Sequence, residues 1–293
     1  MTGYAFETVD VFTTVRFGGN PLAVVLDARG LDDAAMQRIA REFNLSETTF
    51  VFPPEDAAHT ANVRIFTPVT ELSFAGHPNV GTALVLAGHM PVRPSLMIFE
   101  EKAGLVPIDF DWSGPFARAT LYAPQPLTRD GNIPAGIAAR CVGLAASDIL
   151  TTGHEPTIAG VGTNFVIVEV TEGALARATP DLAAMREAAE AYPVRPLGFP
   201  VHLHAATNRG RRSRNFSPLA GIPEDPATGS ANVALAALLL SLGTGAEMSI
   251  EIEQGVEMGR ASVLYAGARR AADGIRAWVG GSAVAVMKGV IEA

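Results

Sequence analysis

A repeated helix start limits the fold more than any other feature of this sequence. Gly76-His77-Pro78-Asn79-Val80 opens one almost wholly apolar run, and Gly229-Ser230-Ala231-Asn232-Val233 opens another, 153 residues later (229 − 76). A run that is apolar on every side predicts a helix buried on every side, which belongs at the centre of a domain. Two such helices predict two domains, each built around its own helix.

Three further stretches recur in the same order, which favours a duplicated architecture. They pair Asn20-Pro21-Leu22-Ala23-Val24 with Asn164-Phe165-Val166-Ile167-Val168, Asp33-Ala34-Ala35-Met36-Gln37 with Leu182-Ala183-Ala184-Met185-Arg186, and Arg64-Ile65-Phe66-Thr67-Pro68 with Arg214-Asn215-Phe216-Ser217-Pro218. Short β-prone runs surround the helical ones. The sequence therefore predicts an α/β (α+β) fold of two pseudo-symmetric domains, each a curved, mostly antiparallel sheet wrapped around its central helix.

The domain boundary is predicted near residue 115. A length of 293 residues suits two domains at about 150 residues each. We assign 1–115 to an N-terminal domain and 116–279 to a C-terminal domain. The last strand, about 280–293, follows the Gly280-Gly281 break, and we expect it to return to the N-terminal domain, which is otherwise short of strands.

Composition excludes several classes of partner. The chain is 48% apolar with a net charge of −8, so it lacks the clustered cations that nucleic acid or an anionic membrane surface requires. It shows neither a signal peptide nor an apolar run near 18 residues, and we expect a cytoplasmic protein. One local cluster is basic and consists of Arg209, Arg211, Arg212 and Arg214. A solvated loop is favoured for this cluster over an anion-binding lid.

Cofactor and thiol chemistry are not indicated. The single cysteine, Cys141, lies in apolar sequence and is predicted to be buried filler, without a partner for a disulfide or a two-thiol relay. The six histidines form no His-Glu-x-x-His or similar cluster, so no metal is predicted. Phosphate-loop and dinucleotide-binding motifs are missing, so no cofactor is expected.

The two helix starts are candidate anion sites, because backbone N–H groups and the helix dipole favour a carboxylate or phosphate there. The substrate-binding candidates are Gly76, His77, Pro78, Asn79, Gly229, Ser230 and Ala231.

Three side chains are candidates for catalysis: Glu47, His77 and Asp225. Each has a structural alternative. His77 can satisfy the helix start, Asp225 and Thr228 can cap the second helix, Ser230 can be an ordinary helix-start serine, and Glu47 can be an exposed strand residue. Taken together, a carboxylate, a histidine, an aspartate and a hydroxyl near helix N-termini suit proton transfer at a carbon next to a carboxylate.

These residues lie in motifs that resemble the phenazine-biosynthesis PhzF-like isomerase family, which has the diaminopimelate epimerase-like fold. The matching stretches, spread over the whole chain, are Asn44-Leu45-Ser46-Glu47-Thr48-Thr49-Phe50, 74–83, 224–231, Gln254-Gly255 and Met258-Gly259-Arg260. The resemblance implies that Glu47 transfers the proton, and that His77, Asp225 and Ser230 assist. It also implies a site between two domains, no cofactor, and commonly a homodimer.

The leading hypothesis is a cofactor-independent isomerase that moves a proton on a small carboxylic acid. The substrate would be held between the two helix N-termini, and Glu47 would serve as general base and acid. The related epimerases carry one cysteine at each helix start, whereas this chain has His77 and Ser230 in that region, so a two-thiol racemase is disfavoured. The alternative is a non-catalytic protein that keeps the fold as a small-acid binding or interaction module.

Overall fold

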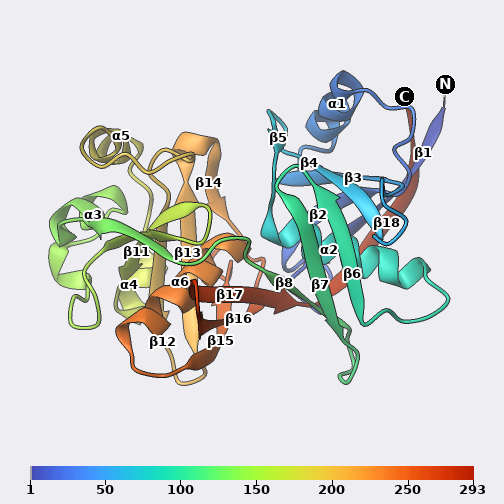
Figure 1. Cartoon of the computed structure of the whole chain (residues 1–293). Helices are drawn as coiled ribbons and strands as arrows, with labels where there is room; N and C mark the ends of the chain where they lie inside the picture. The colour runs from blue at the N-terminus through green and yellow to red at the C-terminus, as the bar shows by residue number, and fades with distance from the viewer. Residues whose placement is uncertain (1) are drawn as a thin grey trace. The chain divides into compact units, whose positions relative to one another are not determined.

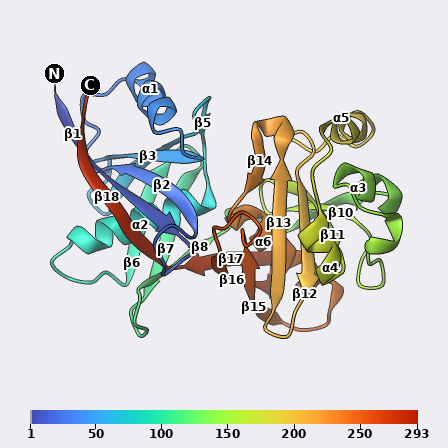
Figure 2. The ribbon, with the colours of Figure 1, turned by 180° about the vertical axis from the view of Figure 1, so that it is seen from behind.

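The computed structural model describes residues 2–293, which divide into two compact units (Figure 1 and Figure 2). One unit contains the chain as far as Tyr122 together with Gly280–Ala293, and the other contains Ala123–Val279. Both units combine helices with a mostly antiparallel sheet, so the predicted fold class is confirmed. Across the described residues, no helix is long and apolar enough to span a membrane.

The first unit has eight strands before the second unit begins, and it regains one strand at the end of the chain. Its elements are β1 (Gly3–Val11), β2 (Asn20–Val25), α1 (Asp33–Phe43), β3 (Glu47–Phe52), β4 (Ala61–Phe66), β5 (Glu71–Leu72), α2 (Gly76–His89), β6 (Leu96–Glu101), β7 (Gly104–Asp111), β8 (Arg118–Tyr122) and β18 (Ala283–Glu292). The last strand pairs antiparallel with the first, so β18 continues the sheet beyond β1.

The second unit has a similar order with additional short helices. Its elements are β9 (Thr128–Asn132), α3 (Ala135–Cys141), η1 (Ala146–Asp148), β10 (Thr157–Gly160), β11 (Asn164–Glu169), α4 (Glu172–Arg177), α5 (Leu182–Ala191), β12 (Val201–Ala206), β13 (Arg211–Ser217), η2 (Pro218–Ala220), β14 (Ile222–Asp225), α6 (Gly229–Leu242), β15 (Glu247–Gln254), β16 (Ser262–Ala271) and β17 (Gly274–Gly281). The helices α3 and α4 have no counterpart among the sequence-based predictions.

Strand pairing has the same pattern in both units. In the first, β1–β2 is antiparallel, β2–β3 parallel, β3–β4 and β4–β5 antiparallel, β4–β6 parallel and β6–β7 antiparallel. In the second, β10–β11, β11–β12, β12–β13, β13–β14, β13–β15 and β15–β16 follow the same succession. The internal repeat of the sequence is therefore a repeat of topology.

A repeated ion pair shows that the similarity between the two units extends to side chains. Arg64 on β4 binds both carboxylate oxygens of Glu71, with Nε and Nη2 each 2.7 Å away. Arg214 on β13 binds Glu224 in the same two-pronged way, at 2.8 and 2.9 Å. Each guanidinium also covers the phenylalanine ring two residues further along its own strand. This geometry ties each strand to the short strand that precedes the central helix.

The central helices lie against the strands of their own units. The helix α2 contacts β1, β2, β3, β7, β8 and β18, and α6 contacts β10, β11, β15 and β16. Gly81 explains how closely α2 approaches its sheet. A Cβ atom there would lie 2.6 Å from Leu22 Cδ2 and 2.7 Å from Val11 Cγ2, so a side chain would displace β1 or β2.

The predicted solvated arginine loop is wrong for three of its four members. Arg209 is exposed in the turn before β13, whereas the other three lie on the strand itself. Arg214 is only 7% exposed. Each strand arginine is held by a carboxylate from a neighbouring segment: Glu169 for Arg211, Glu257 for Arg212 and Glu224 for Arg214. Charge pairing thus makes a basic run compatible with a buried strand.

Cys141 is buried in the core of the second unit, as predicted. It ends α3, and burial raises the pKa of its thiol to about 11. A thiol that remains protonated at neutral pH is a poor nucleophile, so its role is packing.

Candidate functional site

Glu47 and His77 face each other in the first unit. Glu47 opens β3, where its pairing with Leu22 of β2 fixes the direction of the side chain, and His77 is the second residue of α2. The His77 Nε2 and Glu47 Oε2 atoms are 3.3 Å apart, and the two residues are only 5% and 9% exposed. The alternative of an exposed Glu47 is therefore wrong.

Two neighbouring side chains set the tautomer of His77. The Ser46 hydroxyl donates to Asn20 Oδ1 at 3.0 Å, which leaves the Asn20 amide nitrogen facing His77 Nδ1 at 3.4 Å. An amide nitrogen can only donate, so Nδ1 is the acceptor and the ring proton lies on Nε2. The imidazole proton is thereby on the nitrogen that lies 3.3 Å from the Glu47 carboxyl.

Burial keeps His77 neutral. Desolvation lowers the pKa of the imidazole from 6.5 to about 3, because the charged form has no access to water. The contact with Glu47 is therefore an N–H facing a carboxyl and not an ion pair. At 3.3 Å the two groups approach closely without forming a well-formed hydrogen bond. The alternative in which His77 caps its own helix is not what the ring contacts show.

Both predicted helix starts lack a side-chain cap. Ala75 precedes α2 and Thr228 precedes α6, and at neither N-cap does a side chain bond the first turn of the helix. Neither first turn contains an acidic residue. No acidic residue within either first turn therefore occupies the positive end of its helix dipole, which favours the binding of an anionic ligand there.

The substrate-binding candidates occupy the first turns of these helices. Gly76, His77, Pro78 and Asn79 are buried in the first unit, and Asn79 donates from Nδ2 to the carbonyl oxygen of Ala75 at 3.0 Å. In the second unit Gly229 and Ala231 are buried and Ser230 is half-buried.

Asp225 and Thr228 interact with each other at the start of α6. The Thr228 hydroxyl donates to Asp225 Oδ2 at 2.6 Å and accepts from Gln254 Nε2 at 3.0 Å. It makes no bond to the first turn of α6, so the expectation of a Thr228 side-chain cap is wrong. The bond instead orients the Asp225 carboxylate from one side. Asp225 is half-buried.

Gln254 braces the same helix start from the end of β15. Its Nε2 donates to the Asp225 carbonyl oxygen at 2.7 Å, and its Oε1 accepts from the Thr228 N–H at 3.1 Å and from Asn232 Nδ2 at 2.7 Å. Asn232 also donates to the Thr228 carbonyl oxygen at 3.0 Å. The loop that carries Asp225 is therefore held by a buried amide network.

Sequence reasoning missed four residues that orient the candidate groups: Asn20, Ser46, Asn232 and Gln254. For two of them the signal was specific, because Asn232 occupies the same place in its motif as Asn79 and Gln254 belongs to a motif of the family resemblance. Asn20 opens a repeated stretch and Ser46 lies in a motif of the family resemblance, but their contact with each other and with His77 depends on the pairing of β2 with β3.

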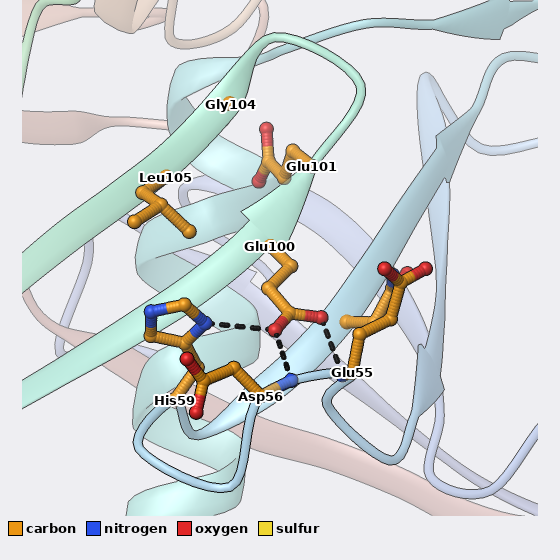
Figure 3. Close-up of a pocket in the computed structure, with 8 residues that line it drawn as sticks. Glu55, Asp56, His59, Glu100, Glu101, Gly104 and Leu105 are labelled. Atoms are coloured by element: carbon orange, nitrogen blue, oxygen red, sulfur yellow. Dashed lines mark hydrogen bonds and ion pairs between the residues drawn. The ribbon is translucent and has the colours of Figure 1, made fainter.

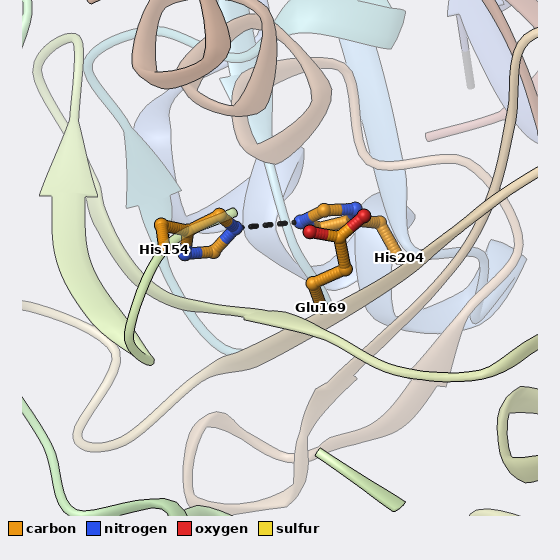
Figure 4. A group of neighbouring side chains, drawn as sticks. All are labelled: His154, Glu169 and His204. Carbon is orange, nitrogen blue, oxygen red and sulfur yellow. Dashed lines mark hydrogen bonds between the residues drawn. The ribbon is translucent and has the colours of Figure 1, made fainter. Parts of the chain in front are cut away.

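One group of described residues has the composition of a metal site: His154, Glu169 and His204 (Figure 4). Their ligand atoms lie within 4.8 Å of one another. However, Arg211 donates to His204 Nδ1 at 3.0 Å, and a guanidinium can only donate. His204 must then carry its proton on Nε2, the atom that a cation would need.

Hydrogen bonds account for this cluster without a metal. His204 Nε2 donates to His154 Nε2 at 3.0 Å, and His154 Nδ1 donates to the carbonyl oxygen of Glu155 at 2.7 Å. Burial, together with the Arg211 charge, places the pKa of His204 well below 6.5, so this ring is neutral. Every ring nitrogen has a partner, which favours a structural chain over a cation site.

A separate hollow of about 500 Å³ opens on the first unit (Figure 3). Glu100 is the centre of its polar wall and accepts from the backbone N–H groups of Glu55 and Asp56 at 2.7 and 2.9 Å and from His59 Nδ1 at 2.7 Å. These bonds lower the pKa of Glu100 to about 2. Neither Glu47 nor His77 lines this hollow, so it is not the catalytic candidate.

Comparison with known proteins gives the relationship of the chain. The model of the phenazine biosynthesis-like protein family (PhzC-PhzF) matches residues 9–289. An uncharacterised isomerase of Mesorhizobium japonicum is 40% identical over 263 residues, 86% of each chain. The trans-2,3-dihydro-3-hydroxyanthranilate isomerase of Pseudomonas fluorescens is 36% identical over 294 residues, 98% of each chain.

A solved structure supports the fold. The PhzF-family protein of Bacillus anthracis superimposes with a TM-score of 0.88 at 24% identity, covering 100% of both chains. The chain therefore belongs to the phenazine biosynthesis-like (PhzF) family. The protein is an isomerase, as its relatives are named.

Proposed function

We propose that the protein is a cofactor-independent isomerase that moves a proton on a small carboxylic acid. Glu47 removes the proton from a carbon conjugated to the carboxylate and returns it elsewhere on the substrate. The observation that carries the proposal is the buried pair at the start of an uncapped helix, where His77 Nε2 lies 3.3 Å from Glu47 Oε2.

The local geometry suits general acid–base catalysis. A carboxyl group shielded from water exchanges a proton with a substrate carbon more effectively than an exposed one, because its charge is less stabilised by solvent. The neutral His77 places its ring nitrogen Nε2 3.3 Å from Glu47 Oε2 and does not neutralise the charge of that carboxylate. His77 thus holds the base in position and can adjust as Glu47 gains and loses the proton.

In this proposal the substrate carboxylate is bound by the two helix starts. The N–H groups and dipoles of α2 and α6 stabilise the negative charge that spreads into the carboxylate when the carbon loses its proton. Asp225, fixed by Thr228 and by the Gln254 network, is assigned to binding or proton relay, and Ser230 to a hydrogen bond with the substrate. That the enzyme is cytoplasmic and works as a homodimer remains a prediction from the sequence.

Deuterium uptake from heavy water tests the reaction without knowledge of the product. Wild-type protein is incubated with a panel of small cyclic and amino carboxylic acids, and carbon-bound deuterium is followed by NMR. The panel begins with trans-2,3-dihydro-3-hydroxyanthranilate, after which the Pseudomonas fluorescens relative is named. We expect catalytic uptake into at least one acid. Acids that bind tightly without any uptake would favour the binding-module alternative.

A further inference from the structure

The strands β6 and β15 are equivalent in the two units, and each ends in a polar residue. The parallel pairings β4–β6 and β13–β15 have the same register relative to the repeated arginine motif, which places Glu100 and Glu253 at equivalent positions. The next residues, which close the two strands, are Glu101 and Gln254. A carboxyl in the first unit thus stands where the second unit has an amide.

The partners of these two side chains are also equivalent. Asn79 and Asn232 each donate from Nδ2 to the carbonyl oxygen at the N-cap of their own helix, both at 3.0 Å. Gln254 accepts from Asn232 at 2.7 Å, and the side chain that interacts with the Glu101 carboxyl is Asn79. Glu101 therefore occupies, next to α2, the bracing position that Gln254 occupies next to α6.

The surroundings of Glu101 do not suit a carboxylate. Both carboxyl oxygens and Asn79 Oδ1 are buried without a well-formed hydrogen bond from any described group. Desolvation raises the pKa of Glu101 to about 8, with Asn79 opposing the shift. A protonated carboxyl offers one acceptor oxygen and one O–H donor, which are the two functions of a glutamine amide.

We propose that Glu101 is a positioning residue that works in its protonated form, bracing Asn79 and the start of α2 as Gln254 braces Asn232 and the start of α6. A neutral Glu101 leaves the positive end of α2 available to the substrate anion, whereas an ionised Glu101 adds a competing negative charge beside it. The effect on substrate binding rests on the proposed function, but the protonation state of Glu101 does not.

Other charged groups lie near Glu101. Figure 3 shows the Glu100 carboxylate directed at His59 and Asp56 and set apart from the Glu101 carboxyl. Glu100, with a pKa of about 2, and His77, with a pKa of about 3, do not titrate between pH 7 and 9. Other charged groups of this region are Glu55, Asp56 and His59, and Glu71 with its partners Lys102 and Arg64.

The first test measures the carboxyl group directly. Carbon-13 NMR of protein labelled at the glutamate carboxyl should show one resonance that titrates with a midpoint near pH 8 and disappears in Glu101→Gln. Glu100→Gln, at the neighbouring residue, is the matched control and should leave that titration in place. A Glu101 carboxyl that titrates near its ordinary value of 4.5 would overturn the proposal.

The second test follows the exchange reaction from pH 7 to 9. In wild type the apparent KM for the acid that exchanges deuterium should rise above about pH 8, approaching tenfold per pH unit, while kcat changes less. Glu101→Gln should keep a low KM that does not depend on pH. Glu101→Leu, which is neutral but cannot hydrogen-bond, should lose at least tenfold in kcat/KM.

Identical kinetics in the Gln and Leu variants would contradict the bracing role, because a space-filling residue needs no hydrogen bond. If none of the proteins exchanges deuterium, the proposed function fails, and the carboxyl titration still decides the protonation state of Glu101.

Discussion

His77 is the residue at which burial and hydrogen bonding determine the chemistry together. Its ring proton lies on Nε2 because Nδ1 accepts from Asn20, and the Asn20 amide is in turn oriented by Ser46. The imidazole stays neutral because burial lowers its pKa to about 3. A neutral donor next to Glu47 can support a carboxylate before proton transfer without competing for the proton.

Nitrogen-15 NMR of the histidine rings tests this protonation state. At pH 5 His77 should still be neutral and carry its proton on Nε2, whereas an exposed histidine with a pKa near 6.5 is mostly charged there. In Asn20→Asp, a carboxylate facing Nδ1 should raise the His77 pKa and move a proton onto Nδ1. A doubly protonated His77 in wild type at pH 5 would contradict this assignment.

The central helices are stabilised by the burial of their apolar side chains. Leu238 and Leu242 both lie on α6, but Leu238 is fully buried whereas Leu242 is 42% exposed. Leu238→Ala should lower the free energy of unfolding by about 2–5 kcal/mol, through lost burial and the cavity that remains. Leu242→Ala should cost less than about 1 kcal/mol. Denaturant unfolding measures both, and equal losses would show that α6 is not the centre of its unit.

Element type and order were predictable from the sequence because both are local or repeated. The Gly-x-x-Asn-Val starts, the apolar runs behind them and the repeated arginine motif all correspond to matched elements of the two units. The short helices α3 and α4 were missed, since six or seven residues give too few turns for a clear period.

Side-chain partners were not predictable, because they depend on strand register. The position of Glu47 follows from its pairing with Leu22, which no local pattern encodes. The basic run at Arg211 looked solvated because its carboxylate partners come from distant segments. The equivalence of Glu101 and Gln254 required both sheets to be aligned.

The stability of the whole chain should have a maximum near neutral pH. Burial lowers the pKa of His77 to about 3, of His202 to about 4 and of His204 well below 6.5, so unfolding takes up protons at these sites below pH 6.5. Stability from these three groups is therefore lost as the pH falls from 6.5.

Glu101 acts in the opposite direction. Its pKa is raised from 4.5 to about 8, so the folded protein holds a proton that the unfolded chain releases, and stability falls as the pH rises from 4.5 to 8. Between about pH 4.5 and 6.5 three histidines oppose one carboxyl, and the net slope is a loss toward acid. Above about pH 6.5 the three histidines no longer change the stability, and Glu101 lowers it as the pH rises.

Denaturant midpoints measured from pH 4.5 to 9 check this profile. Wild type should be most stable between about pH 6 and 7, and Glu101→Gln should remove most of the decline on the alkaline side. A wild-type midpoint that keeps rising from pH 7 to 8.5 would contradict the proposed state of Glu101.

The most direct measurement of the central claim compares Glu47→Gln with wild type in heavy water. We expect the variant to bind the exchanging acid with nearly the wild-type Kd and to lose carbon-bound deuterium uptake by at least a thousandfold, roughly the size of a general-base contribution. Glu42→Gln makes the same chemical change at an exposed position on α1 and should exchange at the wild-type rate. Full deuterium uptake by Glu47→Gln would show that another residue transfers the proton.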